Sequence, residues 1–200
     1  MMKNLFAQKL KIWEAALLIS LCAALCAGTW AQGRMENIRG GLMRLHVIAA
    51  SDEEYEQALK LRVRDAVLEY LGPKLENAES RREAEEIIRL SIPGIARSAA
   101  AAAEGRRVSV TLGQESYPTR YYGGFSLPGG RYDSLRVVLD EGKGQNWWCV
   151  VFPPLCTGAV TAEAVETLGG QEKAIITQSE DYRLAFRLLE IWGELTDRQK

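Results

Sequence analysis

The segment NWWCVVFPPLC at residues 146–156 constrains the fold more than any other part of the sequence. Residues 147–152 form an uninterrupted apolar run, which is typical of a buried strand. Because adjacent residues of a strand point to opposite faces, we expect Trp147 and Trp148 on different faces of a sheet. The two prolines that follow favour a stiff, bent loop after this strand.

The tandem tryptophans allow two interpretations. One indole faces outward and, beside the Pro-Pro loop, forms a protein-contact surface, because aromatic side chains carry much of the energy of binding. Alternatively, both rings cap the hydrophobic core. The candidate partner-binding residues are Asn146, Trp147, Trp148, Phe152, Pro153 and Pro154.

The N-terminus has the pattern of an export signal. Lys3, Lys9 and Lys11 precede an apolar run over residues 15–27, and small residues follow it. This order is typical of a secretory signal peptide at residues 1–31, cut after Ala31. The alternative is an uncleaved membrane anchor that uses residues 12–31, although the apolar run is short for a span. Both readings predict that the body of the chain is exported.

The exported part keeps two cysteines, Cys149 and Cys156. In an oxidising compartment a lone pair of this kind is most simply a disulfide, which here would fix the shape of the Pro-Pro loop. The alternative is a reactive thiol, with Cys149 paired to His46, the only histidine, in a Cys-His hydrolase acting on peptide or cell wall. One histidine and two cysteines do not make a zinc site, and no cofactor motif occurs.

Composition and charge exclude several classes of function. The chain has 200 residues, a formal net charge of -1 and no cluster of basic residues. A nucleic-acid partner is therefore not expected. The glycine pairs do not match a phosphate-binding loop and are typical of turns.

Hydrophobic periodicity predicts one α+β domain over residues 43–200, preceded by a linker at 32–42. We expect a mostly antiparallel sheet packed by helices. The predicted strands cover residues 43–50, 107–112, 121–127, 132–139 and 147–152. The predicted helices run from a Ser51 cap to Gly72-Pro73, from a Ser80 cap to Gly105 with a kink or break at Pro93-Gly94, and over 179–195. Turns are predicted at Gly129-Gly130 and residues 142–144, and a weakly structured connector at 158–178.

Several motifs resemble the stage II sporulation protein R family of endospore-forming bacteria. They are RLHVIA at 44–49, QALKL at 57–61, VRDAV at 63–67, YPTR at 117–120, GKGQNWWCV at 142–150 and FPPLC at 152–156. The resemblance covers most of residues 43–156, and the terminal helix around residues 182–192 also fits.

The resemblance implies a signalling protein secreted from the forespore into the space between the forespore and mother-cell membranes. There it is expected to activate a membrane-embedded aspartic-type protease, which then cuts the precursor of a mother-cell sigma factor. The resemblance implies no enzymatic activity, and no catalytic residues are carried over. A purely structural coat or wall component is a further alternative.

Overall fold

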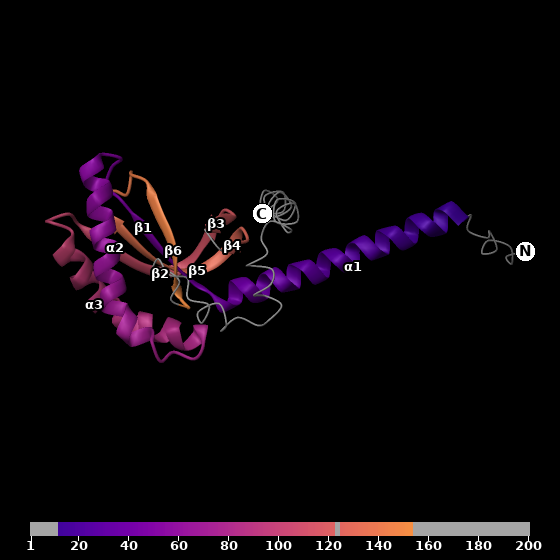
Figure 1. The fold of residues 1–200 in the computed structure, drawn as a ribbon, viewed down its shortest axis with the longest axis horizontal. Helices are drawn as coiled ribbons and strands as arrows, with labels where there is room; N and C mark the ends of the chain where they lie inside the picture. The colour runs from indigo at the N-terminus through magenta and orange to yellow at the C-terminus, as the bar shows by residue number, and fades with distance from the viewer. Residues whose placement is uncertain (1–11, 123–124, 154–200) are drawn as a thin grey trace, which may run out of the picture. The chain divides into compact units, whose positions relative to one another are not determined.

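A computed structural model of the chain describes residues 12–122 and 125–153. One helix and one strand are followed by two helices and then five strands, as Figure 1 shows. The elements are α1 (Ile12–Gly41), β1 (Met43–Ile48), α2 (Glu54–Leu75), α3 (Arg81–Ala102), β2 (Val108–Tyr117), β3 (Arg120–Tyr122), β4 (Phe125–Leu127), β5 (Gly130–Leu139) and β6 (Asn146–Phe152). The predicted α+β class with a mostly antiparallel sheet is confirmed.

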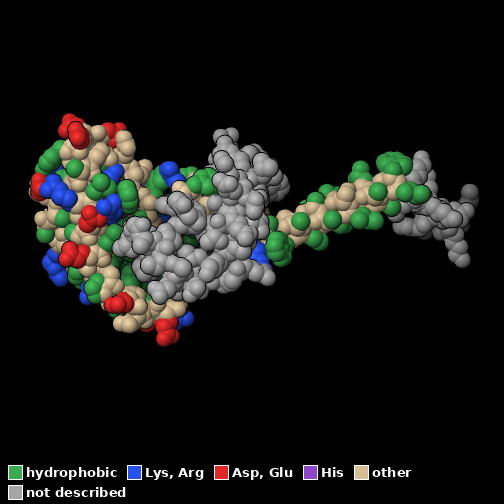
Figure 2. Space-filling model, viewed as in Figure 1, with side chains coloured by type: hydrophobic (Ala, Val, Ile, Leu, Met, Phe, Trp, Pro, Cys, Tyr) green, Lys and Arg blue, Asp and Glu red, His purple; other side chains and the backbone are tan. Residues whose placement is uncertain are grey.

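The chain divides into two compact units, Met1–Glu36 and Asn37–Lys200. Helix α1 is unbroken for 30 residues, so the stretch 32–41 is helical and not the irregular linker that its composition indicates. Ile38 and Leu42 are fully buried, and this burial explains why residues without clear periodicity stay helical. The N-terminal part of α1 carries exposed hydrophobic side chains, which Figure 2 shows along its visible face.

The main sheet contains four strands in the order β2-β5-β1-β6. Strand β1 pairs in parallel with β5 and antiparallel with β6, while β2 pairs antiparallel with β5. All six residues of β1 are buried, since the strand is central in the sheet. The register places Leu45 beside Leu135 and Cys149, and it places the neighbouring His46 beside Trp148.

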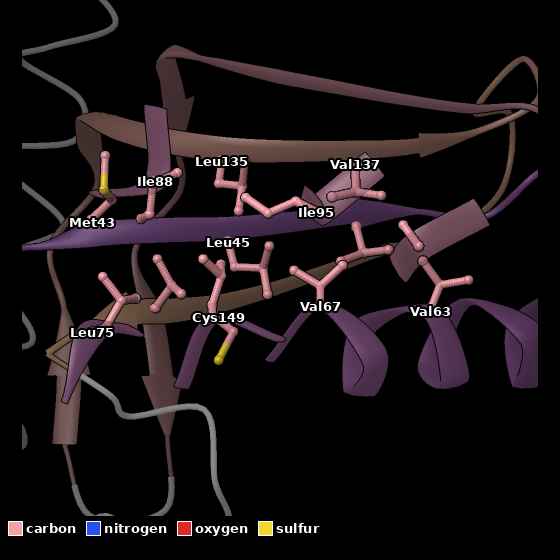
Figure 3. Close-up of a cluster of buried hydrophobic side chains, with 14 of the residues drawn as sticks. Met43, Leu45, Val63, Val67, Leu75, Ile88, Ile95, Leu135, Val137 and Cys149 are labelled. Atoms are coloured by element: carbon pink, nitrogen blue, oxygen red, sulfur yellow. The ribbon is translucent and has the colours of Figure 1, made fainter. Parts of the chain in front are cut away.

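Helices α2 and α3 pack on one face of this sheet and form the hydrophobic core with it (Figure 3). Alternate residues of the strands point into this layer, as the period of two predicts. The helices contribute residues that include Leu59, Val63, Val67, Leu71, Ile88, Ile95 and Ala99. The strands contribute Met43, Leu45, Val47, Leu135, Val137, Leu139, Cys149, Val151 and Phe152.

One of the two predicted helix caps is confirmed. The Ser80 hydroxyl accepts the backbone N–H of Glu83 at 3.2 Å, and α3 begins at the next residue. The predicted cap at Ser51 is wrong, because α2 begins only at Glu54. The Ser51 hydroxyl instead accepts the N–H of Glu53 at 3.4 Å, in the turn that precedes the helix.

Pro73 does not end α2 as the sequence predicts, and Pro93 does not break α3. Helix α2 passes through Pro73 to Leu75, which is buried, and α3 is continuous through Pro93. The lost backbone hydrogen bonds are outweighed by the buried side chains on either side. Gly94 allows the close approach of the two helices, since a Cβ there would lie 1.9 Å from the Tyr70 hydroxyl oxygen.

The connection between β2 and β5 contains a second, smaller sheet. The sequence predicts one short strand at 121–127, but the structure has two, β3 and β4, which pair antiparallel. Gly129-Gly130 is therefore not a tight hairpin turn, and Gly130 already belongs to β5. The turn predicted at residues 142–144 lies slightly earlier, because the Gly142 N–H donates to the Leu139 carbonyl oxygen at 3.0 Å and Gly142, at a φ of 63°, closes the turn.

Several predictions fall on residues outside the described ranges. They concern Pro154, Cys156, the connector at 158–178 and the helix at 179–195. These remain predictions.

Candidate functional site

Strand β6 directs its two tryptophans to opposite faces of the sheet, as predicted. Trp147 packs against the core on the helix side, and the guanidinium carbon of Arg64 lies 4.4 Å from its ring centroid. Trp148 lies on the other face, because its register partner His46 alternates with the core residues Leu45 and Val47. Both indoles are half-buried.

Trp148 is held by aromatic and cationic neighbours. Its ring centroid lies 5.8 Å from that of His46 and 6.0 Å from that of Tyr117. The guanidinium carbon of the exposed Arg120, at the start of β3, lies 4.1 Å from the indole centroid. Such stacking orders an arginine and leaves its N–H groups directed outward for further hydrogen bonds.

His46 is fixed by hydrogen bonds at both ring nitrogens. Nδ1 lies 3.2 Å from each carboxylate oxygen of Glu115 on β2, and Nε2 lies 2.8 Å from the side-chain oxygen of Asn146 on β6. The exposed Arg136 adds an ion pair to Glu115 at 3.5 Å. The imidazole therefore joins strands from both sides of β1.

The charges around Glu115 keep it ionised. Burial alone would raise the pKa of this carboxyl group. Hydrogen bonds from His46 and Ser134, with electrostatic interactions with His46 and Arg136, outweigh that effect. The pKa of Glu115 therefore lies below its usual 4.5.

A buried polar layer lies beneath this cluster. The Tyr117 hydroxyl is 2.6 Å from the Ser134 hydroxyl, and burial raises the pKa of Tyr117, so the phenol stays protonated. Arg44 is completely buried, lies 4.4 Å from the Tyr117 ring centroid, and donates from Nε to the Cys149 carbonyl oxygen at 2.8 Å. These contacts stiffen the support under Trp148.

The Cys-His arrangement considered from the sequence is not assembled. Cys149 lies in the helix-side core beside Leu45 (Figure 3), whereas His46 projects from the opposite face. Both nitrogens of His46 already have partners, so no nucleophile is activated there. Within the described ranges, no group of three His, Cys, Asp or Glu side chains is placed to hold a metal ion. The ordered aromatic and polar side chains around Trp148 suit a binding surface.

The structure separates the candidate partner-binding residues into two groups. Asn146 is exposed and lies on the same face as Trp148, whereas Trp147 and Phe152 belong to the helix-side packing. Pro153 is buried, and Pro154 lies outside the described residues. We therefore define the Trp148 surface as Trp148, His46, Asn146, Arg120 and Arg136.

Sequence reasoning missed the contributions of Arg120 and Arg136 to this surface. The alternation of apolar residues over 43–50 could have placed His46 on the face opposite Leu45. The remaining neighbours of Trp148 and His46 lie on strands that are distant in sequence. Their positions beside these two residues follow only from the strand order and register.

The disulfide remains a prediction. The free cysteines among the described residues are Cys22 and Cys26, and Cys149 is not one of them. Its expected partner, Cys156, lies outside the described ranges.

Two comparisons with known proteins, one with family models and one with curated proteins, point to the same family. The family described as stage II sporulation protein R matches residues 39–162. Stage II sporulation protein R of Bacillus subtilis (strain 168) is 37% identical over 118 residues, which are 57% of this chain and 53% of that protein. The chain thus spans about half the length of the relative it matches. No solved structure matches it.

Proposed function

Because the chain belongs to the stage II sporulation protein R family, we propose that it is an exported sporulation signal. In this proposal its folded domain activates a membrane-embedded aspartic-type protease. That protease then cuts the precursor of the mother-cell sigma factor, after the signal has left the forespore for the space between the two membranes. The domain acts by binding and not by catalysis.

The observation that carries the proposal is the extent of the family match. Residues 39–162 begin in the last turn of α1 and include every strand of the main sheet. The match therefore covers the hydrophobic core and the Trp148 surface together. The apolar helix α1 is compatible with the export that the role requires.

We place the contact with the protease on the Trp148 surface. Tryptophan and arginine are the residue types that most often dominate the energy of protein interfaces. Trp148 is half-buried and held by neighbours on several sides, so little side-chain entropy remains to be lost on binding. Arg120, Arg136 and Asn146 are exposed around it and supply hydrogen-bonding groups.

The loop that begins at the buried Pro153 is a separate, second candidate for the contact. Strand β6 carries Trp148 and ends at Phe152. The loop therefore begins directly after the strand that carries Trp148. A disulfide between Cys149 and Cys156 would fix the loop relative to the strand. Thiol titration of the denatured, non-reduced domain should then find no reactive thiol at either position.

The test is co-expression of this protein, the protease and the sigma-factor precursor in a host that does not sporulate. We expect cleavage of the precursor only when all three are present. Cleavage without this protein, or none with all three expressed and correctly located, would overturn the proposal. The result is read as the ratio of cleaved to uncleaved precursor on immunoblots.

A further inference from the structure

The N-terminal part of α1 is apolar on every side. Its large exposed side chains are Ile12, Trp13, Leu17, Leu18, Ile19, Leu21, Leu25 and Trp30, with exposed fractions between 48% and 89%. At about 100° per residue these positions surround the helix and do not form a single stripe. A helix that is apolar all round and not buried in protein is suited to a lipid environment.

Two tryptophans mark the ends of this apolar segment. Trp13 and Trp30 are both exposed, and at 1.5 Å per residue they lie about 25 Å apart along the helix axis. The hydrocarbon core of a bilayer is about 30 Å thick, and tryptophans concentrate at its two interfaces. Arg34 follows one turn later, with its guanidinium carbon 5.4 Å from the Trp30 ring centroid, where it can reach the headgroups.

Glu14 lies beside Trp13 at the N-terminal end of the apolar segment, and the hydroxyl groups between the two tryptophans are satisfied within the helix. Residues 15–31 contain no charged side chain. The Ser20 hydroxyl donates to the Leu17 carbonyl oxygen at 2.9 Å, and the Thr29 hydroxyl donates to the Cys26 carbonyl oxygen at 3.0 Å. A span inside hydrocarbon requires this, because no water is available to the hydroxyl groups.

The bond after Ala31 lies in the interior of α1. The helix continues to Gly41, and Ile38 and Leu42 are fully buried beyond that bond. Proteases act most readily on exposed loops, whereas cutting here requires several helical turns to unwind. Thr29 and Ala31 place relatively small side chains at the two positions that signal cleavage requires, so the sequence at this bond permits a cut and the continuous helix is the feature that opposes it.

We propose that α1 is a retained membrane anchor, whose residues 12–31 span a lipid bilayer while remaining attached to the folded domain. Lys3, Lys9 and Lys11 precede the span, whereas Arg34 and Arg39 follow it together with Glu36. The short N-terminal segment carries three lysines, whereas a long domain translocates largely regardless of its charge, so the N-terminal end is placed in the cytoplasm and the domain outside. The inference does not depend on which protein the domain activates.

The test uses the full chain with a C-terminal epitope tag, expressed in a host with a general secretion pathway. Membranes are washed with alkaline carbonate, and the tagged protein is analysed by intact mass. We expect the protein in the washed membranes, soluble in mild detergent, with residues 1–31 still present. Protein released from the membranes without residues 1–31, or pelleted material that detergent does not dissolve, would overturn the proposal.

A matched variant shows that the assay can detect cleavage. Thr29→Ala combined with Trp30→Ser creates a small-residue site at the same bond and removes one interfacial ring. We expect this double variant to appear partly as a shorter, soluble domain, while the unaltered chain does not. Equal release of both proteins would overturn retention.

A second variant tests the span itself. Leu21→Arg places a charge near the middle of the apolar segment, where it is most costly in hydrocarbon. We expect most of the protein to be lost from carbonate-washed membranes, whereas Leu90→Arg, at an exposed position on α3, should leave membrane retention unchanged. Unchanged retention of the Leu21 variant would overturn the proposal. None of these readouts uses precursor cleavage, so failure of the proposed function and failure of the anchor are distinguishable.

Discussion

The two faces of the main sheet are built from the same strands but have different tasks. The face toward α2 and α3 is aliphatic and almost completely buried. The other face carries Trp148, His46, Glu115 and Arg136, which are joined by ring contacts, hydrogen bonds and an ion pair. The first face provides most of the stability of the domain, and the second supplies a preorganised polar surface that the core does not need. Substitutions on the two faces should therefore separate folding from activity.

Leu45→Ala should have the largest effect on stability. Leu45 is fully buried at the centre of the helix-side core, and truncating such a leucine costs about 2–5 kcal/mol. Urea denaturation followed by circular dichroism measures this change in the free energy of unfolding. A loss below about 1 kcal/mol would mean that the helix-side face contributes less than we infer.

The tryptophan pair gives the most direct comparison of the two faces. Trp147→Ala should lower the free energy of unfolding by about 2 kcal/mol, since the ring packs on the core. Trp148→Ala should reduce precursor cleavage at least about tenfold, as expected for a residue central to an interface. Both quantities are measured for both variants. The result would contradict this separation of folding and binding if the Trp148 variant unfolded at a lower urea concentration than the Trp147 variant and still supported normal precursor cleavage at saturating expression.

Arg120→Glu tests the charged part of the Trp148 surface. The reversed charge disrupts the cation–π contact and should lower precursor cleavage by a factor of about 3–10, with little change in stability. Arg82→Glu, at an exposed position of α3, is the control with the same change in charge. Equal cleavage by the two variants would remove Arg120 from the contact.

The smallest expected effect concerns acid stability. The pKa of Glu115 is lowered in the folded domain, so its stabilising contribution is complete above the usual pKa of 4.5 and is lost as pH falls through the lower folded value. Glu115→Gln should therefore be less stable than the unaltered chain near neutral pH, and the difference should shrink between about pH 5 and pH 3. Urea denaturation at several pH values measures it. A difference that is independent of pH would show that the charge of Glu115 has no role in folding.

The sequence predicts the local elements better than their ends. The strands at 43–50, 132–139 and 147–152 and the Ser80 cap are confirmed because each depends on alternation or on a nearby hydrogen bond. The predicted helix end at Pro73 failed because burial of Leu75 outweighs the cost of a proline in the last turn. Helix-ending signals in the local sequence do not include the free energy gained by burying Leu75 against the rest of the domain.

The candidate site was predictable only in part. The opposite orientations of Trp147 and Trp148 follow from the period of a strand. The contacts of His46 do not, since Glu115 is 69 residues away and Asn146 is 100 residues away. Such a cluster depends on strand order, which includes the parallel pairing of β1 with β5 across two intervening helices. No short motif encodes that order.

The proposed retention of α1 has a consequence for how far the folded domain can travel. A domain held by such an anchor would not diffuse beyond its own reach from the bilayer. Its encounters are then confined to a thin layer, where effective concentrations are high even for few molecules. Under the proposed function, activation would then require direct contact between two apposed membranes, so its timing would follow their approach and not the amount of protein released.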